Sequence, residues 1–225
     1  MLQAYLSFHR ETQEALPDGF ENLIRSFSAE AEPGKKGGLI VRQKKQWQAY
    51  SLEKYQEFVA CRHSVRDFDD TSVDDTRIQE IIEVSLNTPS VCNRQGWMVH
   101  YYNSKKEIND LLSYQNGNAG FSECIDKLLI VTGNIKAFTR HEHNQLFIDG
   151  GLLSMNIMLA LHAAGLGSCP LNTCMPFNKE STLKNAAGIP KHEKLIMMIA
   201  IGSLKEKFSV AQSEKYKLAD VLKVH

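Results

Sequence analysis

The sequence has no excess of either charge, since its 26 basic residues are balanced by 26 acidic ones. A chain with balanced charge has no long-range field that attracts nucleic acid or an anionic membrane, so we expect neither as a partner. A few well-placed cations would have to hold any phosphorylated ligand. The chain also lacks internal repeats, which excludes solenoid and propeller folds.

Cysteine is scarce, and its spacing is not that of a bridged or metal-binding protein. The cysteines form no C-x-x-C pair and are odd in number, which argues against a disulfide framework and a zinc knuckle. They are Cys61, Cys92, Cys124, Cys169 and Cys174. The N-terminus also lacks an uncharged stretch long enough for a secretion leader, because Arg10 and Glu14 interrupt it. We therefore expect reduced thiols and a cytoplasmic protein.

The length and apolar content are typical of one compact domain with an appended segment. The chain has 225 residues, of which 43% are hydrophobic, so it can bury a substantial core. Residues 1–50 differ in character from the rest. Their pattern predicts an amphipathic helix over 12–27 and a loop over 32–38, where proline and glycine interrupt it. We therefore expect an N-terminal extension at 1–50 and the main domain at 51–225.

One long uncharged stretch could be mistaken for a membrane span. No Asp, Glu, Lys or Arg occurs from Gly150 to Asn178, but polar residues, glycines and Pro170 interrupt the run. We predict a buried helix over 145–164, ended by Gly165 in a left-handed conformation and followed by a buried turn. A helix that is apolar around most of its circumference needs partners on all sides, which predicts homodimerisation through this helix.

From Ser51 onward the periodicity predicts helices and strands in alternation. We expect helices over 51–60, 74–86 and 178–187 and after a capping box at 104–107, strands over 97–102, 127–132 and 195–201, and a polar loop over 134–145. Residues 218–222 could form a final strand or a helix. The pattern indicates an α+β or α/β fold, with three or more strands wrapped by helices around one long central helix.

Two cations flank a hydroxyl in the segment Arg62-His63-Ser64-Val65-Arg66-Asp67-Phe68. In an extended backbone alternate side chains share a face, so Arg62, Ser64 and Arg66 point the same way. This arrangement suits an elongated ligand with an anionic end, a polyol middle and a second electron-rich region. A basic strand that faces only water would explain the same residues.

Three further segments have the chemistry of ligand contacts. Short polar side chains in Pro89-Ser90-Val91-Cys92-Asn93-Arg94-Gln95-Gly96-Trp97 can hydrogen-bond a heteroaromatic edge, although an ordinary loop explains them equally well. Glycines in 165–172 allow backbone to approach a flat ligand. This is not a dinucleotide-binding loop, because the third glycine is missing and the segment follows a helix. Lys215-Tyr216-Lys217 adds two alternating cations, which alone would indicate a solvated tail.

In their order and spacing, these four segments resemble the nitroreductase family of FMN-dependent oxidoreductases over about residues 52–222. The resemblance is carried by Arg62-His63-Ser64-x-Arg66-x-Phe68, Pro89-Ser90-x-x-Asn93-x-Gln95-x-Trp97, Gly165-Leu166-Gly167-x-Cys169-Pro170, and Ile201-Gly202 followed by Lys215-x-Lys217. It implies an α+β fold, a three-layer α/β/α sandwich with a mixed or antiparallel central sheet. It also implies a long buried central helix and a homodimer with FMN bound at the dimer interface.

The resemblance implies a set of FMN contacts. These are Arg62, Lys215 and Lys217 for the phosphate; His63 and Ser64 for the ribityl chain and its phosphate end; Arg66 for the N1/O2 edge of the isoalloxazine; Asn93 for the pyrimidine edge; Pro89 and Ser90 for the pocket lining; and Pro170, Leu171 and Asn172 for the ring and its N5. No acid or base is implied, because hydride transfer needs none from the protein.

The implied activity is transfer of hydride from NAD(P)H through flavin N5 to a small acceptor by a ping-pong cycle. A nitroaromatic, a quinone, an enone or free flavin would serve as acceptor. Flavin fragmentation, reductive dehalogenation and non-catalytic flavin binding are alternatives. His141-Glu142-His143 would suggest metal-dependent hydrolysis if a third ligand were present, but none is identifiable by spacing, so we expect no metal.

Overall fold

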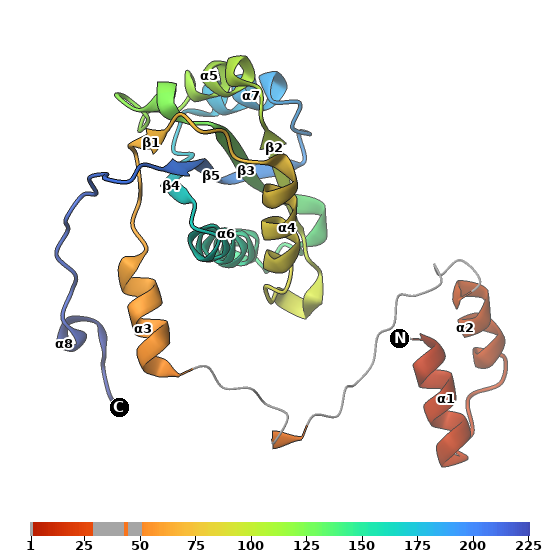
Figure 1. Cartoon of the computed structure of the whole chain (residues 1–225). Coiled ribbons are helices and arrows are strands. Elements are labelled where there is room, and N and C mark those ends of the chain that lie inside the picture. Colours follow the sequence, from red (N-terminus) through yellow and green to blue (C-terminus); the bar gives the residue numbers. More distant parts are fainter. Residues whose placement is uncertain (1, 29–42, 45–50) are drawn as a thin grey trace. The chain divides into compact units, whose positions relative to one another are not determined.

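The computed structural model of the chain describes residues 2–28, 43–44 and 51–225. Its contacts divide the chain into two units, Met1–Ser51 and Leu52–His225. The first unit contains helices α1, Leu2–Thr12, and α2, Phe20–Ser28 (Figure 1). Our prediction of one helix over 12–27 is wrong, because Pro17 cannot continue a helix and Gly19 adopts a φ of 77°. The loop predicted over 32–38 lies outside the described residues.

The second unit contains the remaining regular elements. Its strands are β1 Phe68–Asp69, β2 Trp97–Tyr102, β3 Lys127–Asn134, β4 Gly167–Leu171 and β5 Glu193–Leu204. Its α-helices are α3 Leu52–Cys61, α4 Asp75–Ser85, α5 Lys105–Leu112, α6 Gln145–Ala163, α7 Phe177–Ala186 and α8 Leu218–Val221. Short 3-10 helices are η2 Val91–Asn93, η3 Ser122–Cys124 and η4 Ile135–Ala137. The helices and strands predicted from periodicity are therefore confirmed to within a few residues, and the C-terminal segment is helical.

The strands form one antiparallel sheet around the long strand β5. One edge of β5 pairs with β3, and β2 pairs with the far edge of β3. Strand β4 also pairs with β5, along Gly167–Leu171, and β1 pairs with the end of β5 at Ser203 and Leu204. The antiparallel alternative that the resemblance allowed is the one observed.

Side-chain alternation along β3 divides the core into two clusters. Leu128 and Ile130 belong to the cluster formed with α5 and α7, whereas Leu129 and Val131 belong to the cluster formed with α4 and α6. Figure 1 shows α5 and α7 on one face of the sheet and α4 and α6 on the other. All four side chains are fully buried, and each stabilises the fold by about 1.5–3 kcal/mol. The predicted three-layer α/β/α sandwich is confirmed.

Helix α6 has a buried face and a second, exposed apolar face. Leu153, Ile157 and Leu161 lie in the core. The exposed face, which we call the α6 apolar face, consists of Phe147, Ile148, Leu152 and Met155, each 41% to 52% exposed. Among the described residues α6 is also the helix long and apolar enough to cross a membrane, a test that the core helix of a soluble protein passes as well.

At the helix ends and around β4, some local predictions are confirmed and others are wrong. Gly165 has the predicted left-handed backbone, with a φ of 75°, but Gly167–Leu171 is strand β4 rather than part of a turn. Glycine and proline suggested a turn, yet β4 lies near the edge of the sheet, where proline is tolerated. Asp74 caps α4 as predicted, by accepting from Thr76 N at 3.0 Å. Ser104 occupies the N-cap of α5 without the predicted side-chain hydrogen bond.

Candidate functional site

The segment that carries the paired arginines lies beside β4. Ser64 forms a parallel bridge with Ser168, and Val65 N donates to Ser168 O at 3.0 Å. The segment is extended here, as its alternating pattern predicted. Ser64 and Val65 thus add a short stretch beside β4, whereas Arg62 N still donates to Val59 O at the end of α3. That Arg62, Ser64 and Arg66 share one face stays a prediction.

Positive charge accumulates near β4 without an acidic partner. Arg66 is exposed, and its Cζ lies 5.9 Å from the centroid of the Phe121 ring, whereas Arg62 is half-buried. Burial raises the pKa of the Cys169 thiol on β4, and the charges of Arg66 and Arg62 oppose that rise, so both guanidinium groups lie near this strand. In the part of the chain that the structure describes, neither arginine forms a salt bridge. The donor set fits an anionic ligand.

A hollow opens where β4 ends. It has a volume of about 520 Å³ and is lined by Pro170, Leu171, Asn172, Thr173, Cys174, Ile196 and Met197. The side chain of Asn172 accepts from Cys174 N at 3.0 Å, and its carbonyl accepts from Gln115 Nε2 at 3.1 Å. The backbone after β4 is thereby fixed, and its apolar lining suits a planar ring more than a small polar molecule.

The second predicted segment forms a tight loop between α4 and β2. Ser90 Oγ accepts from Gln95 N at 2.9 Å, and Val91 N donates to a carboxylate oxygen of Asp149 at 3.2 Å. Asn93 is exposed and has a φ of 52°, a left-handed conformation that asparagine tolerates better than most residues. Pro89 is exposed, and Ser90 is half-buried.

These two segments lie at opposite edges of the sheet. The Arg62–Arg66 segment lies beside β4, whereas the loop at 89–96 leads into β2. Neighbouring strands are about 4.8 Å apart, so the width of the sheet separates the segments by about 20 Å. The two ends of helix α6 lie at the two segments. His162 near its C-terminus contacts Phe58, just before the Arg62–Arg66 segment, and Asp149 near its N-terminus contacts Val91 in the other segment. One chain therefore does not bring Arg66 and Asn93 together.

The remaining predicted site residues are on exposed segments. His63 is exposed, and all side chains from 211 to 225 are exposed, including Lys215 and Lys217. Lys217 N donates to Asp220 Oδ2 at 3.1 Å, which fixes the start of α8.

Comparison with known proteins identifies the family of the second unit. A family model described as "Nitroreductase family" matches residues 59–123 and 128–203, more than half of the chain. The chain belongs to the nitroreductase family. A protein of Archaeoglobus fulgidus with the provisional name NADH dehydrogenase/NAD(P)H nitroreductase is 22% identical over 162 residues, which cover 69% of this chain and 88% of that protein.

Solved structures of the nitroreductase family share the fold. A nitroreductase family protein of Streptococcus pneumoniae has a TM-score of 0.64 and 18% identity, covering 76% of this chain and 100% of that chain. An FMN-dependent nitroreductase of Clostridium difficile has a TM-score of 0.61 and 20% identity, covering 75% and 96%. A provisionally named nitroreductase of Desulfovibrio desulfuricans, solved with FMN, has a TM-score of 0.65 and 22% identity, covering 76% and 95%.

Several residues that hold the predicted segments in place have no recognisable motif in the sequence. Ser168 and Asp149 hold the two predicted segments, and Arg94 pairs with Glu142 across two loops. Asp149 could have been noticed as a lone carboxylate at the start of an uncharged helix. Glu142 belongs to the His141-Glu142-His143 sequence, and among the described residues no three His, Cys, Asp or Glu side chains gather as a metal site.

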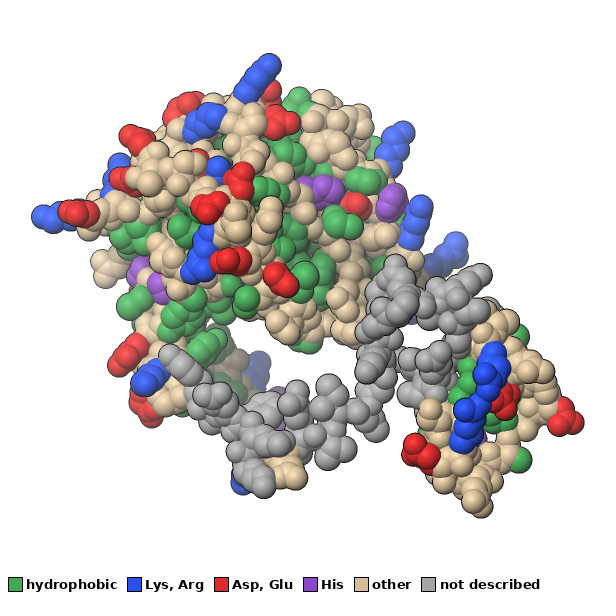
Figure 2. Space-filling view, turned by 45° about the vertical axis from the view of Figure 1, so that its right-hand side comes forward, with side chains coloured by type: hydrophobic (Ala, Val, Ile, Leu, Met, Phe, Trp, Pro, Cys, Tyr) green, Lys and Arg blue, Asp and Glu red, His purple; other side chains and the backbone are tan. Residues whose placement is uncertain are grey.

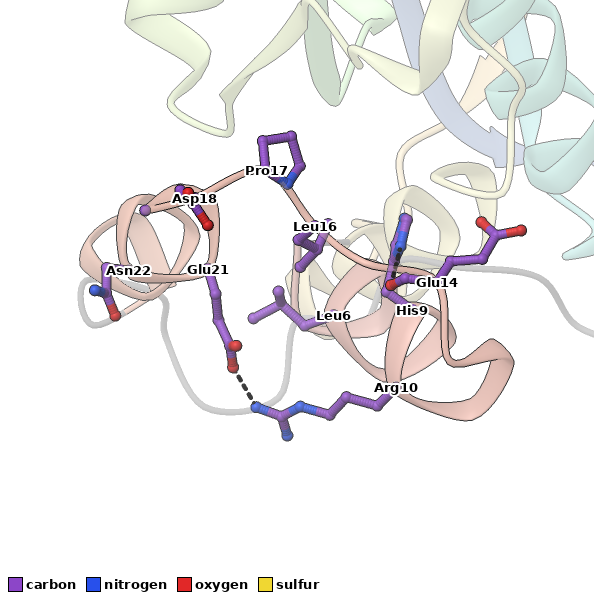
Figure 3. A pocket seen from close by; sticks show the side chains of 10 residues that line it. Leu6, His9, Arg10, Glu14, Leu16, Pro17, Asp18, Glu21 and Asn22 are labelled. Atoms are coloured by element: carbon purple, nitrogen blue, oxygen red, sulfur yellow. Dashed lines mark hydrogen bonds and ion pairs between the residues drawn. The ribbon is translucent and has the colours of Figure 1, made fainter.

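A second hollow lies in the N-terminal unit, outside the residues that the nitroreductase family model matches. It has a volume of about 390 Å³ and lies between α1, α2 and their connection. Figure 3 shows Leu6 and Leu16 inside it and Arg10 reaching Glu21 at its rim, at 2.6 Å. Arg25 also reaches Glu21, at 2.8 Å, so the charges at this rim are paired. The hollow is therefore a feature of the helix pair and not of the site beside β4.

Proposed function

We propose that this protein is an FMN-dependent oxidoreductase that transfers hydride from NAD(P)H to a small electron acceptor. The observation that carries the proposal is the pair Arg62 and Arg66 beside β4, two cations near each other without an acidic partner in the described chain. Family membership supports it, as do the names of an FMN-dependent relative and of a relative solved with FMN. The hollow after β4 has the apolar character that a flavin ring needs.

The chain's own residues would bind and tune the cofactor. FMN, when bound, accepts hydride from a reduced nicotinamide and passes electrons to a second substrate. Arg66 would stabilise negative charge on the reduced ring, and a guanidinium stays charged at any working pH. The other proposed contacts are Arg62, Lys215 and Lys217 for the phosphate, His63 and Ser64 for the ribityl chain, and Pro89, Ser90, Asn93, Pro170, Leu171 and Asn172 for the ring.

These roles require a second copy of the chain. Arg66 and Asn93 are both assigned to the pyrimidine side of one ring, but in a single chain they lie at opposite edges of the sheet. A homodimer with two-fold symmetry would bring the 89–95 loop of one protomer to the Arg62–Arg66 segment of its partner. The α6 apolar face supports such pairing, since four large apolar side chains on one helix are left exposed.

The cycle would be of the ping-pong kind, with the oxidised nicotinamide leaving before the acceptor binds in the same place. Nitroaromatics, quinones and similar small molecules are the acceptor classes that we propose. Residues 51–225 would form the flavin-binding domain, with residues 1–50 as an N-terminal extension. We further propose that the protein works in the cytoplasm, without nucleic acid or membrane as a partner.

An absorption spectrum of the purified protein, before and after anaerobic addition of NADPH or NADH, tests the proposal. We expect a yellow protein, or one that becomes yellow with added FMN, whose flavin band at visible wavelengths bleaches with the nicotinamide. Acceptor addition should restore the band. A colourless protein that takes up no FMN would contradict the proposal. A yellow protein that neither nicotinamide bleaches would indicate flavin binding without this activity.

A further inference from the structure

The loop that carries Asn93 has an unusual backbone. Cys92, Asn93 and Gln95 all have positive φ angles, of 50°, 52° and 50°. A left-handed conformation is unfavourable for residues with a Cβ atom, and such residues persist only where surrounding contacts determine the backbone. Three of them within four positions therefore require strong local contacts.

Contacts at the two ends of the loop help to hold this backbone conformation. Ser90 Oγ accepts from Gln95 N and so closes the loop on itself. Asp149, which is only 2% exposed on α6, accepts from Val91 N at 3.2 Å and from Gln145 Nε2 at 2.8 Å. Neither set of contacts involves the residues from 92 to 94, where two of the left-handed conformations occur.

Within the loop, Asn93 N donates to Ser90 O and Arg94 N to Val91 O, both at 3.0 Å. The side chain of Arg94 adds a contact from outside the loop, because it binds a second loop. Its Nη1 donates to Glu142 Oε2 and to Ala137 O, both at 2.8 Å, and its Nη2 donates to Glu142 Oε1. Glu142 Oε2 also accepts from Thr139 N at 2.7 Å, and the Phe138 ring centroid lies 5.7 Å from the guanidinium carbon. The guanidinium therefore binds both the carboxylate of Glu142 and the backbone of the 137–142 loop.

This ion pair differs from an ordinary surface pair. The side chains of Arg94 and Glu142 are 29% and 20% exposed, whereas those of Arg77 and Glu80 on α4 are 53% and 56% exposed. Hydrogen bonds from Arg94 and from Thr139 N lower the pKa of Glu142 to about 2. Glu142 therefore stays ionised over the whole working pH range. A bidentate ion pair of this kind fixes the orientation of the two groups as well as their distance.

We propose that Arg94 and Glu142 are positioning residues of the flavin pocket. Their ion pair docks residues 137–142 on the 90–95 loop and holds Asn93 in the conformation in which it meets the ring. Neither side chain needs to touch the cofactor. This inference rests on the proposed function, which places Asn93 at the edge of the flavin that the partner protomer holds.

The full-length chain tests this in four variants. Arg94→Ala and Glu142→Gln remove the ion pair, Arg94→Lys keeps the charge but not the two-pronged geometry, and Arg77→Ala is the matched control on α4. Two quantities are measured on each: the Kd for FMN, from flavin fluorescence, and the rate of trypsin cleavage after the exposed Arg140 in FMN-free protein. A circular dichroism spectrum confirms that each variant is folded.

We expect Arg94→Ala and Glu142→Gln to raise the FMN Kd about tenfold and to accelerate cleavage after Arg140. Arg94→Lys should lie between these variants and the wild type, and Arg77→Ala should change neither quantity. Wild-type protein that binds no FMN would refute the proposed function itself. If the wild type binds FMN and the Kd is unchanged in Arg94→Ala and Glu142→Gln, only the positioning role is overturned. Faster cleavage in these variants would not rescue it, because it would show that the ion pair holds the 137–142 loop but does not affect the flavin pocket.

Discussion

Single cations in the proposed site should differ in what they do. Arg66 lies beside β4 close to Cys169, so it is expected to act on the reduced ring, whereas Lys217 is expected to act on the phosphate alone. Arg66→Ala should lower kcat/KM by about 10- to 100-fold while most FMN remains bound, because it removes charge stabilisation more than anchoring. Lys217→Ala should raise the FMN Kd about fivefold and leave the activity per bound flavin unchanged.

Activity per bound flavin and the FMN Kd, measured on the same preparations, separate these two roles. Lys223→Ala is the matched control, because Lys223 is also an exposed lysine of the C-terminal segment. Parallel losses of activity and FMN in Arg66→Ala and Lys217→Ala would contradict the assignment of different roles.

A buried carboxylate far from the arginines should control acid stability. Glu193 is 5% exposed, accepts from Thr132 Oγ1, and has an oxygen 2.7 Å from His100 Nε2. Burial raises the pKa of Glu193, but hydrogen bonds from Thr132 and His100 more than offset it, so the net pKa is lowered from 4.5. A depressed folded-state pKa contributes stability that is present above the unfolded value and lost as the pH falls through the folded value.

Glu193→Gln should therefore change both the size and the pH dependence of stability. We expect the free energy of unfolding at pH 7 to fall by about 1.5–3 kcal/mol, because the hydrogen bonds to Thr132 and His100 lose their charged acceptor. Below pH 4.5 the variant should lose less stability than the wild type. Urea unfolding at a series of pH values measures this, with Glu206→Gln on an exposed segment as the control. If the free energy of unfolding fell equally in Glu193→Gln and in the wild type as the pH was lowered, Glu193 would not be the group that controls acid stability.

At the scale of elements, strong apolar patterns were predictable and weak local signals were not. The continuous apolar runs of β3 and β5 and the uncharged run of α6 identified these elements, because burial on both faces leaves no polar positions. Strand β4 was missed because its glycine and proline suggest a turn, and only pairing with β5 makes it a strand. In the N-terminal unit α1 was missed, and the helix expected over 12–27 crosses Pro17, so only its second half matches α2.

The candidate site was predictable in its parts but not in its arrangement. The alternating pattern predicted that Arg62 and Arg66 share a side, and the bridges at Ser64 and Val65 are consistent with extended backbone between them. The separation of Arg66 from Asn93 depends on the strand order, which follows from pairings between segments distant in the sequence. Arg94 and Glu142 are 48 residues apart, so no local pattern indicates that they meet.

The packing of α6 on the sheet should depend on one glycine of β3. A Cβ at Gly133 would lie 2.4 Å from Leu146 Cγ and within 2.9 Å of both Leu146 methyl carbons. Gly133→Ala should therefore lower the free energy of unfolding by about 1–3 kcal/mol, because the first turn of α6 must shift. Lys106→Ala is the control, because Lys106 is exposed on α5, on the opposite face of the sheet from α6, and its substitution should change stability by less than about 0.5 kcal/mol. Chemical denaturation compares them, and equal stabilities would show that Leu146 adapts without cost.

At the scale of the whole molecule, assembly and cofactor binding should be inseparable. If each pocket takes the Arg62–Arg66 segment from one chain and the 89–95 loop from another, a substitution that separates the chains must also empty the pocket. Leu152 is a good position for this test because it belongs to the α6 apolar face, is 46% exposed, and is distant in sequence from every proposed FMN contact.

Leu152→Asp should convert a dimer into a monomer in light scattering and weaken FMN binding in the same concentration range. Burying a leucine is worth about 1.5–3 kcal/mol, and two copies of the change plus a buried charge should raise the dimer Kd at least 100-fold. Phe177→Asp is the control, because Phe177 is 75% exposed on α7, in the layer on the opposite face of the sheet. A monomeric Leu152→Asp that binds FMN as tightly as the wild type would mean that one chain holds the flavin alone, and the shared pocket would be wrong.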